Sequence, residues 1–347
     1  MNKVSQDNVK DEPGGSPPPL PKFVGLIYSE VKREYFPTAE QYITEKDAKE
    51  DAIVIASYLE KMGIQTKLYP GRPEMMITLA KDHPDMVFNL VGSINGQEYL
   101  AASIPGMLEA MDIAYTGAGM LGESLAYNKY LVKDLLSTHA VPTPRTQLFP
   151  SATTVMSPEL RFPLISKLNE IHGAVEVTED AVSHDEKHLR ERLKFLISTY
   201  QQPVIVEEFI AGRELTAIVL EGGNTKVYLA EKVFRETEDP TQFATFADQW
   251  TGENDSYHYE KITDITLVEL VKRAFRVLKM GDYAKFDIRL DQSGRYYFID
   301  SNSNPAFGPK ELDVALASIL DMYGVGFDEI LKRLMSNTLR DWSKRLS

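Results

Sequence analysis

The sequence contains no cysteine, and this absence removes several kinds of chemistry. Without thiols the chain forms no disulfide bond, and no thiolate serves as a nucleophile or metal ligand. No apolar run of about 18 residues occurs either, which excludes a membrane-spanning helix. Residues 1–21 lack the apolar core of a signal peptide, so we expect a disordered leader on a cytoplasmic protein.

Positive charge is also scarce, because 38 Lys and Arg residues stand against 51 Asp and Glu residues, a formal net charge of −13. A general nucleic-acid binder needs the opposite balance, so we expect neither nucleic-acid nor membrane partners. An anionic ligand would need a locally basic cleft. The length of 347 residues is too great for one ordinary core and predicts two or three packed domains.

The most informative stretch, residues 281–305, predicts two strands joined by a tight turn at Ser293 and Gly294. A two-residue turn places Asp287 directly opposite Asp300, whereas a four-residue loop makes them diagonal neighbours on the same face. Both registers bring the two carboxylates together. Opposed carboxylates destabilise a sheet unless a cation neutralises them.

A metal ion would supply that cation. Asn302 lies two residues after Asp300 and adds a third oxygen to the same face, while Tyr297 and Ile299 are predicted to point into the core. Asp287, Asp300 and Asn302 suit Mg²⁺, which takes one or two carboxylates and completes its shell with phosphate oxygens and water. The alternative is an ordinary polar hairpin surface.

Buried strands alternate with amphipathic helices in the first third of the chain, which predicts a parallel α/β domain. Thr44 and Asp47 resemble a capping box that opens a helix ending at Gly63. A short strand is predicted at residues 113–115, and the later part is rich in strands, with one predicted at residues 175–180. These patterns divide the chain into a leader, an N-terminal domain, a central lobe and a C-terminal lobe at residues 1–21, 22–117, 118–210 and 211–347.

One long polar segment, residues 235–260, separates two groups of predicted strands. It is too long for a plain connection in a compact domain, because most such connections have about 4–6 residues. We therefore predict that this segment is an active-site lid.

Five segments resemble the ATP-grasp superfamily, specifically its D-alanine–D-alanine ligase-like branch, from Lys22 to about Leu334. The match rests on their common order, because each segment alone is weak. The resemblance implies the ATP-grasp fold, in which an N-terminal parallel α/β domain precedes two α+β lobes that clamp ATP. The segments are VFNLVGSINGQEYLAASIPGMLEAMDIAYTG, NKYLVKDLLSTHAVPTP, PLISKLNEIHGAVEV, VIVEEFIAGRELT and AKFDIRLDQSGRYYFIDSNSNP.

The resemblance also implies where ATP binds. Lys129 and Lys167 would reach its phosphates. The backbone around His172, Gly173 and Ala174 would cover those phosphates. The adenine would lie against the segment of Glu207, Glu208, Phe209 and Ile210, and Glu214 would bind the ribose.

The metal ligands implied by the resemblance are the three found from the hairpin alone, Asp287, Asp300 and Asn302. Lys285 stands where the family usually has Arg and would stabilise the oxyanion formed when an amine attacks. Arg289 shares its strand face and is a second candidate catalytic residue. The implied reaction is a ligation that depends on ATP and Mg²⁺, in which a carboxylate becomes an acyl phosphate and an amine then displaces the phosphate.

Departures from the family leave the substrates open. Asp300 stands where the family usually has Glu, and residues 174–176 of the phosphate loop read AVE in place of Ser-x-Gly, with an acid near the phosphates. The first N-terminal loop lacks the usual glycine-rich pattern. After the metal hairpin, Phe307 could form an apolar wall and Lys310 could meet a substrate carboxylate, or each could be structural.

We therefore expect small-molecule carboxylate and amine substrates, with a homodimer as an open option. D-alanine is not the expected preferred substrate, because the loops that position substrates in the family have changed most. Two alternatives remain open. One is a non-catalytic nucleotide-binding protein on the same fold, and the other is a secondary-metabolism ligase that adds an amino acid to a non-peptide scaffold.

Overall fold

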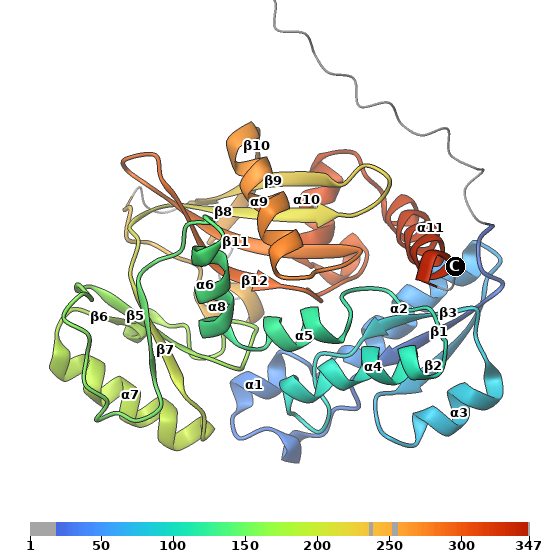
Figure 1. Ribbon diagram of the computed structural model, residues 1–347, viewed down its shortest axis with the longest axis horizontal. Helices are drawn as coiled ribbons and strands as arrows, with labels where there is room; N and C mark the ends of the chain where they lie inside the picture. The colour runs from blue at the N-terminus through green and yellow to red at the C-terminus, as the bar shows by residue number, and fades with distance from the viewer. Residues whose placement is uncertain (1–18, 236–238, 252–255, 346–347) are drawn as a thin grey trace, which may run out of the picture.

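The computed structural model describes residues 19–235, 239–251 and 256–345. These residues form three sheets, and Figure 1 shows β5, β6 and β7 at the left, β1, β2 and β3 at the right, and β8 to β12 above. The first sheet is parallel with the strand order β2-β1-β3. Its elements are β1 (Phe23–Tyr28), η1 (Arg33–Tyr35), α1 (Ala39–Ile43), α2 (Ala48–Lys61), β2 (Gln65–Pro70), α3 (Met75–Asp82), β3 (Met86–Leu90), η2 (Glu98–Ala102) and α4 (Ser103–Ala110).

Apolar residues at helical spacing attach α2 to this sheet, since Ala52, Ile55 and Leu59 are all buried. The predicted capping box is wrong. Thr44 is the C-cap of α1, where its hydroxyl donates to the carbonyl of Gln41 at 2.8 Å, and α2 begins four residues later, at Ala48, without a side-chain cap. The predicted strand at residues 113–115 is reduced to one bridge, between Tyr115 and Val87.

The central lobe is a four-stranded antiparallel sheet with the order β4-β7-β5-β6. Helix α7 covers it, and Asp185 caps that helix by accepting from the backbone N–H of His188. The predicted strand at residues 175–180 is wrong, because Glu176 has a φ of 64°, which a strand does not allow. The elements are α5 (Met120–Ala126), α6 (Lys129–Thr138), β4 (Thr146–Phe149), β5 (Leu164–Leu168), η3 (Glu179–Ala181), β6 (Val182–Ser183), α7 (Glu186–Tyr200) and β7 (Val204–Glu208).

The C-terminal lobe is a five-stranded antiparallel sheet with the order β10-β9-β8-β11-β12. Helix α9 packs an apolar stripe on it, with Leu267, Val271, Ala274 and Phe275 buried. The elements are β8 (Gly212–Leu220), β9 (Lys226–Phe234), α8 (Phe246–Trp250), β10 (Tyr257–Ile262), α9 (Ile265–Val277), β11 (Tyr283–Asp291), β12 (Tyr296–Asn302), η4 (Lys310–Leu312), α10 (Ala315–Met322) and α11 (Phe327–Arg345).

The hairpin of β11 and β12 confirms that Asp287 faces Asp300 directly. The register shifts between Asp287 and the next residue, so one extra residue on β12 bulges out. This bulge makes the predicted core residues wrong. Phe298 is buried against Phe286, with ring centroids 5.7 Å apart, whereas Tyr297 and Ile299 are only partly buried.

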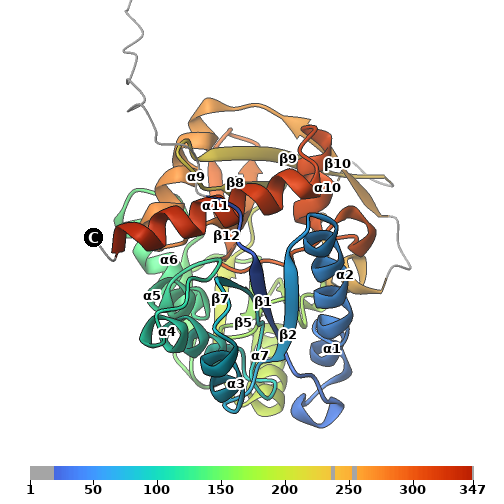
Figure 2. The same cartoon turned by 90° about the vertical axis from the view of Figure 1, so that its right-hand side faces the viewer.

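The C-terminal helix α11 returns to the N-terminal domain and lies between that domain and the C-terminal lobe (Figure 2). Its Leu331 and Met335 share one apolar core with Val24 and Ile55. None of the helices in the described part of the chain is long and apolar enough to cross a membrane.

A buried carboxylate, Asp282 at the start of β11, ties these parts together. It accepts from Asn337 at 2.5 Å, from Thr338 at 2.9 Å and from the backbone N–H of Gly117 at 2.9 Å. The three donors come from α11 and from the predicted border between domains.

We expect Asp282→Ala to lower the free energy of unfolding by about 3 kcal/mol, because three buried donors lose their acceptor. Urea unfolding would measure this loss. Asp112→Ala is the matched control, since Asp112 has a similar φ, 54° against 58°, and is exposed. The control should lose less than about 1 kcal/mol. Equal losses would show that backbone strain, not the hydrogen bonds, sets the effect.

Candidate active site

A cavity of about 870 Å³ lies between the N-terminal domain and the two lobes, with residues from all three sheets in its lining. It is large enough for a nucleotide and a small substrate. The structure brings every predicted site residue to this cavity. The lining includes Lys129, Lys167, His172, Gly173, Ala174, Glu207, Glu208, Phe209, Ile210, Glu214, Lys285, Asp287, Arg289, Asp300 and Asn302.

The three predicted metal ligands lie on one face of the hairpin. Asp287 accepts from Thr216 at 3.0 Å and pairs with Lys285. Among the described residues, nothing donates a hydrogen bond to the side-chain oxygens of Asp300 or Asn302, although both residues line the cavity. Two carboxylates and an amide oxygen, with two of these side chains otherwise unengaged, form a donor set that fits Mg²⁺.

Nearby cations keep both carboxylates ionised. Burial alone would raise the pKa of Asp300, but Lys129 and, after it, His172 hold this pKa well below its usual range. Burial also opposes ionisation of Asp287, yet Lys285 and Lys232 lower the pKa of that group. Both groups are therefore negatively charged at neutral pH.

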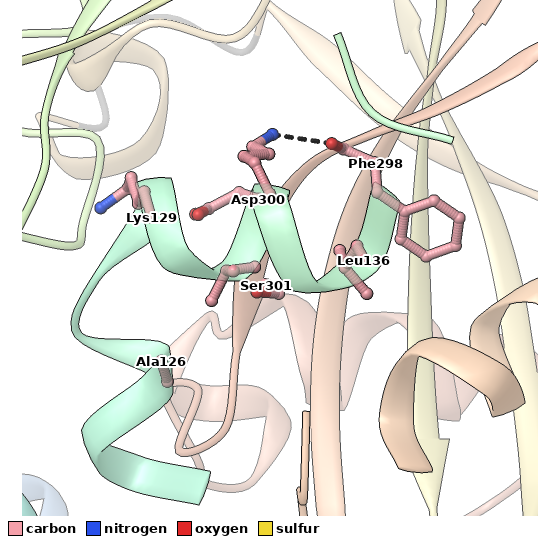
Figure 3. Close-up of a pocket in the computed structure, with 8 residues that line it drawn as sticks. Ala126, Lys129, Leu136, Phe298, Asp300 and Ser301 are labelled. Carbon is pink, nitrogen blue, oxygen red and sulfur yellow. Dashed lines mark hydrogen bonds between the residues drawn. The ribbon is translucent and has the colours of Figure 1, made fainter. Parts of the chain in front are cut away.

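Lys129 begins helix α6, and Asn128 caps that helix by accepting from the N–H of Leu131 at 3.1 Å. Its ammonium donates to the carbonyl of Ile171 at 2.5 Å. In Figure 3 the carboxylate of Asp300 points toward the start of α6, where Lys129 lies. Burial lowers the pKa of Lys129, while Asp300 acts in the opposite direction.

Glu207 lies between two buried lysines. Its carboxylate oxygens are 3.0 Å from Lys133 Nζ and 2.9 Å from Lys167 Nζ. Burial lowers the pKa of Lys133 to about 8 despite this pairing. Lys133 Nζ also donates to the carbonyl of Phe298 at 2.7 Å, the bond drawn as a dashed line in Figure 3. Glu207 thus places Lys167 at the cavity wall and does not present a free carboxylate to adenine.

Glu214 is part of a second charged group, which includes a lysine that the sequence analysis missed. Lys232 on β9 donates to Glu214 at 2.6 Å and lies 4.0 Å from Asp287. Arg289 contacts Glu214 at 3.2 Å and donates to the carbonyls of Ile210, Pro240 and Gln242. The structure therefore engages the Arg289 guanidinium with Glu214 and the chain that follows β9. A direct catalytic role for Arg289 stays a prediction.

The predicted phosphate loop, residues 172–176, keeps a glycine-like backbone although Glu176 stands where the family usually has glycine. Gly173, Ala174 and Glu176 all have φ values between 55° and 71°. The Glu176 carboxylate turns to Arg192 at 3.2 Å and accepts from Tyr200 at 2.9 Å. Arg192 of α7 therefore neutralises the Glu176 carboxylate, so this acid does not conflict with phosphate binding at the loop.

Comparison with known proteins decides the family. Residues 145–336, more than half of the chain, match the family described as D-ala D-ala ligase C-terminus. The chain belongs to this family.

Individual relatives agree with this assignment. The chain is 29% identical over 269 residues to the uncharacterized protein y4sG of Sinorhizobium fredii, covering 74% of this chain and 77% of that protein. It is 25% identical over 292 residues to a D-alanine–D-alanine ligase of Halorhodospira halophila, covering 82% and 89%. The Bacillus anthracis D-alanine–D-alanine ligase complexed with ATP superposes with a TM-score of 0.72 at 18% identity, over 93% of this chain and 99% of that chain.

The protein is thus an ATP-grasp ligase, an enzyme that uses ATP to join a carboxylate to an amine through a C–N bond. Its substrates are small molecules. The predicted fold class, with a parallel N-terminal sheet and two antiparallel lobes, is confirmed.

A contact between the N-terminal domain and the phosphate loop of this ligase was not predicted. Glu98 on η2 accepts from both the backbone N–H and the Nδ1 of His172, each at 2.9 Å. The two residues lie far apart in the sequence, and no local pattern joins them. Glu98 therefore binds the loop from the side of the N-terminal domain.

The predicted lid contains more regular structure than a loop. Helix α8 has a complete capping box between Thr245 and Asp248, and residues from 257 onward form β10. Residues 236–238 and 252–255 lie outside the described residues. Trp250 lines the cavity and donates to the carbonyl of Gly173 at 2.7 Å. Helix α8 thus touches the ligase's phosphate loop, as a nucleotide-covering lid would.

Trp250 is one of two tryptophans, so it can report closure of this predicted lid. In a Trp342→Phe variant, Mg²⁺ and ATP should shift the emission of Trp250 to shorter wavelength, because a lid closed on nucleotide excludes water. Amide exchange across residues 243–250 should slow in parallel. The control, Trp250→Phe, should show no emission change. An unaltered spectrum together with unaltered exchange at saturating nucleotide would contradict the lid.

Proposed function

We propose that this ligase transfers the γ-phosphoryl group of ATP to a small carboxylate and couples the resulting acyl phosphate to an amino acid or another amine, releasing ADP and phosphate. The observation that carries the proposal is the face of Asp287, Asp300 and Asn302, set among buried lysines in one cavity. A protein that only binds a nucleotide has no need of two opposed, ionised carboxylates.

The residues divide into those that hold phosphate and those that act on the acyl group. Lys129 and Lys167 would bind the phosphates and position the γ-phosphoryl group in line with the carboxylate oxygen. Asp287, Asp300 and Asn302 would hold Mg²⁺. Bound Mg²⁺ would neutralise charge on the transferring phosphoryl group.

The second step forms the C–N bond. A neutral amine attacks the carbonyl carbon of the acyl phosphate, the C–O bond to phosphate breaks, and the nitrogen loses a proton. Lys285, which lines the cavity beside Asp287, would stabilise the oxyanion of the tetrahedral intermediate. A lysine does this as a point charge, without the two-pronged contact that the usual Arg makes.

Asp287→Asn tests the metal face, because the change removes charge but preserves shape. We expect substrate-dependent ADP release, measured by a coupled assay, to fall by at least about a hundredfold while the thermal unfolding temperature changes little. Asp291→Asn is the control, since Asp291 ends the same strand and does not line the cavity. Wild-type turnover by Asp287→Asn would show that Mg²⁺ is not held at this face.

The substrate pair is a separate question, and here we expect D-alanine to be a poor substrate. Lys310, one candidate for binding a substrate carboxylate, pairs with Asp321 at 2.6 Å on the surface and does not line the cavity. Phe307 does line it and also packs on Phe88 and Tyr283.

A panel of amino acids scored by ADP release, with products identified by mass, would test this expectation. D-alanine should stimulate release weakly, and another acceptor or donor should exceed it in kcat/KM by at least about tenfold. D-alanyl-D-alanine synthesis more efficient than every other pair would contradict it. A product in which an amino acid is joined to a non-peptide scaffold would place the enzyme in secondary metabolism.

A further inference from the structure

The ligation proposed above also needs a group that accepts a proton. An ordinary amine is an ammonium ion at neutral pH, and its nitrogen attacks the acyl phosphate only after it has lost a proton. The lysines and carboxylates of the metal face have other roles, because they would bind phosphate, Mg²⁺ and the oxyanion. Another group of the cavity must therefore accept this proton.

One atom in the cavity lining suits this role, the Nε2 nitrogen of His172. Among the described residues, two buried side-chain atoms of the lining have no hydrogen-bond partner, Nε2 of His172 and Oε1 of Glu207. Glu207 Oε1 lies 3.0 Å from Lys133 Nζ, so an ion pair satisfies it. His172 Nε2 has no such partner in the described part of the chain. A buried polar atom without a partner is costly, which indicates that a ligand completes its contacts.

The hydrogen bonds of His172 leave a lone pair on this nitrogen. Oε2 of Glu98 accepts from the backbone N–H of His172 and lies 2.9 Å from Nδ1. A carboxylate that accepts at Nδ1 places the ring hydrogen on that nitrogen, so Nε2 of the neutral ring is an acceptor. The same carboxylate stabilises the imidazolium that forms when Nε2 takes up a proton. Glu98 and His172 therefore have the arrangement of a carboxylate-supported general base.

The imidazole is held in place from several sides. Its ring packs edge to face on Tyr127, with ring centroids 5.2 Å apart and an interplanar angle of 78°. The carbonyl of the residue before His172 accepts from Lys129 Nζ at 2.5 Å, and that of the residue after it accepts from Trp250 Nε1 at 2.7 Å. A ring fixed by its neighbours in this way acts on a substrate without losing further conformational freedom.

His172 lies beside the metal face without belonging to it. A positive charge on the ring lowers the pKa of Asp300, so the two groups are close enough to interact electrostatically. Within the described residues, no ion pair joins these two side chains, and the ion pair of His172 is with Glu98. The imidazole is thus near the place where the acyl phosphate would form and separate from the groups that would hold Mg²⁺.

We propose that His172 is the general base that takes a proton from the acceptor amine. This inference rests on the ligase function proposed above and adds a catalytic residue to it. The ammonium nitrogen gives one proton to Nε2, and the freed electron pair forms the bond to the carbonyl carbon of the acyl phosphate. The C–O bond to phosphate then breaks, and its electron pair leaves with the phosphate, which also takes the second proton from the nitrogen. The imidazolium returns its proton to water.

Two nucleophiles of equal size but different protonation test this role. At neutral pH hydroxylamine is largely neutral, whereas methylamine is almost entirely an ammonium ion. The donor carboxylate is the amino acid that gives the most hydroxamate with the wild-type enzyme, ATP and Mg²⁺. Hydroxamate and N-methylamide are then measured by mass in parallel reactions. Loss of a base should slow formation of the methylamide far more than formation of the hydroxamate.

His172→Asn removes Nε2 but keeps a donor for Glu98, because the side-chain amide of Asn occupies the place of Nδ1. We expect the ratio of methylamide to hydroxamate to fall by at least about tenfold in this variant. His258→Asn is the matched control, since His258 also lines the cavity but is exposed on β10 and pairs with Glu260 at 3.1 Å. An unchanged ratio in His172→Asn, or an equal fall in His258→Asn, would overturn the proposal.

His172→Gln separates a base from a hydrogen-bond donor. Its side-chain amide reaches the place of Nε2 but does not take up a proton, so the ratio should again fall by at least about tenfold. A wild-type ratio in this variant would show that His172 only donates a hydrogen bond. That result would overturn the proposal even if His172→Asn does not fold.

Failure of the ligase function looks different from failure of the base. A wild-type enzyme that forms neither ADP nor hydroxamate with any carboxylate of the panel would contradict the ligase function, and the base with it. A wild-type enzyme that forms hydroxamate but no methylamide would contradict the base alone.

Discussion

The repulsion between Asp287 and Asp300 is the constraint around which this ligase is arranged. The two carboxylates face each other across β11 and β12 inside a cavity, where water screens them poorly. Such a pair is stable only when cations surround it. The cations come from four elements in different parts of the chain: Lys129 from α6, Lys167 from β5, Lys232 from β9 and Lys285 from β11.

This dependence links the two lobes. Lys129 precedes the central sheet and Lys167 belongs to it, yet both influence Asp300 of the C-terminal lobe. Lys133 adds a direct contact, because its ammonium bonds the carbonyl of Phe298 and also pairs with Glu207 of the central sheet. Lys167, a predicted phosphate ligand, also donates to the carbonyl of Ile299 on β12 at 3.3 Å, so a group predicted to bind phosphate also joins the two lobes.

The order of most elements and the shared face of Asp287, Asp300 and Asn302 were predictable, because both follow from local periodicity. Alternation along β11 was enough to put Lys285, Asp287 and Arg289 on one side. Strand β10 was missed, because residues 257–260 were assigned to the polar segment 235–260. The bulge on β12 was not predictable, since it depends on how the loop closes between Asp291 and Arg295. The prediction that the two carboxylates face each other is confirmed, whereas the prediction that Tyr297 and Ile299 point into the core is wrong.

Several contacts could not be predicted from the sequence because they join residues that lie far apart in the chain. Nothing local connects Glu98 with His172, Lys232 with Glu214, or Arg192 with Glu176. The capping box at Thr44 failed for a related reason. A Thr followed three residues later by an acid is a common pattern, and here a separate short helix, α1, has the Thr as its C-cap.

The phosphate loop shows how such distant contacts can replace a local requirement. Glycine normally occupies left-handed positions because other residues pay about 1 kcal/mol or more for a positive φ. Here Ala174 and Glu176 occupy them, and Glu176 is held by Arg192 and Tyr200, while Trp250 donates to the carbonyl of Gly173.

Residues with side chains at these positions also have fewer conformations than glycine in a flexible loop. A loop restrained from α7, from α8 and from Glu98 of the N-terminal domain has already lost much of its conformational entropy before phosphate arrives. The departure from the glycine pattern is therefore compatible with phosphate binding, because the required backbone shape is supplied by tertiary contacts in place of glycine's intrinsic freedom.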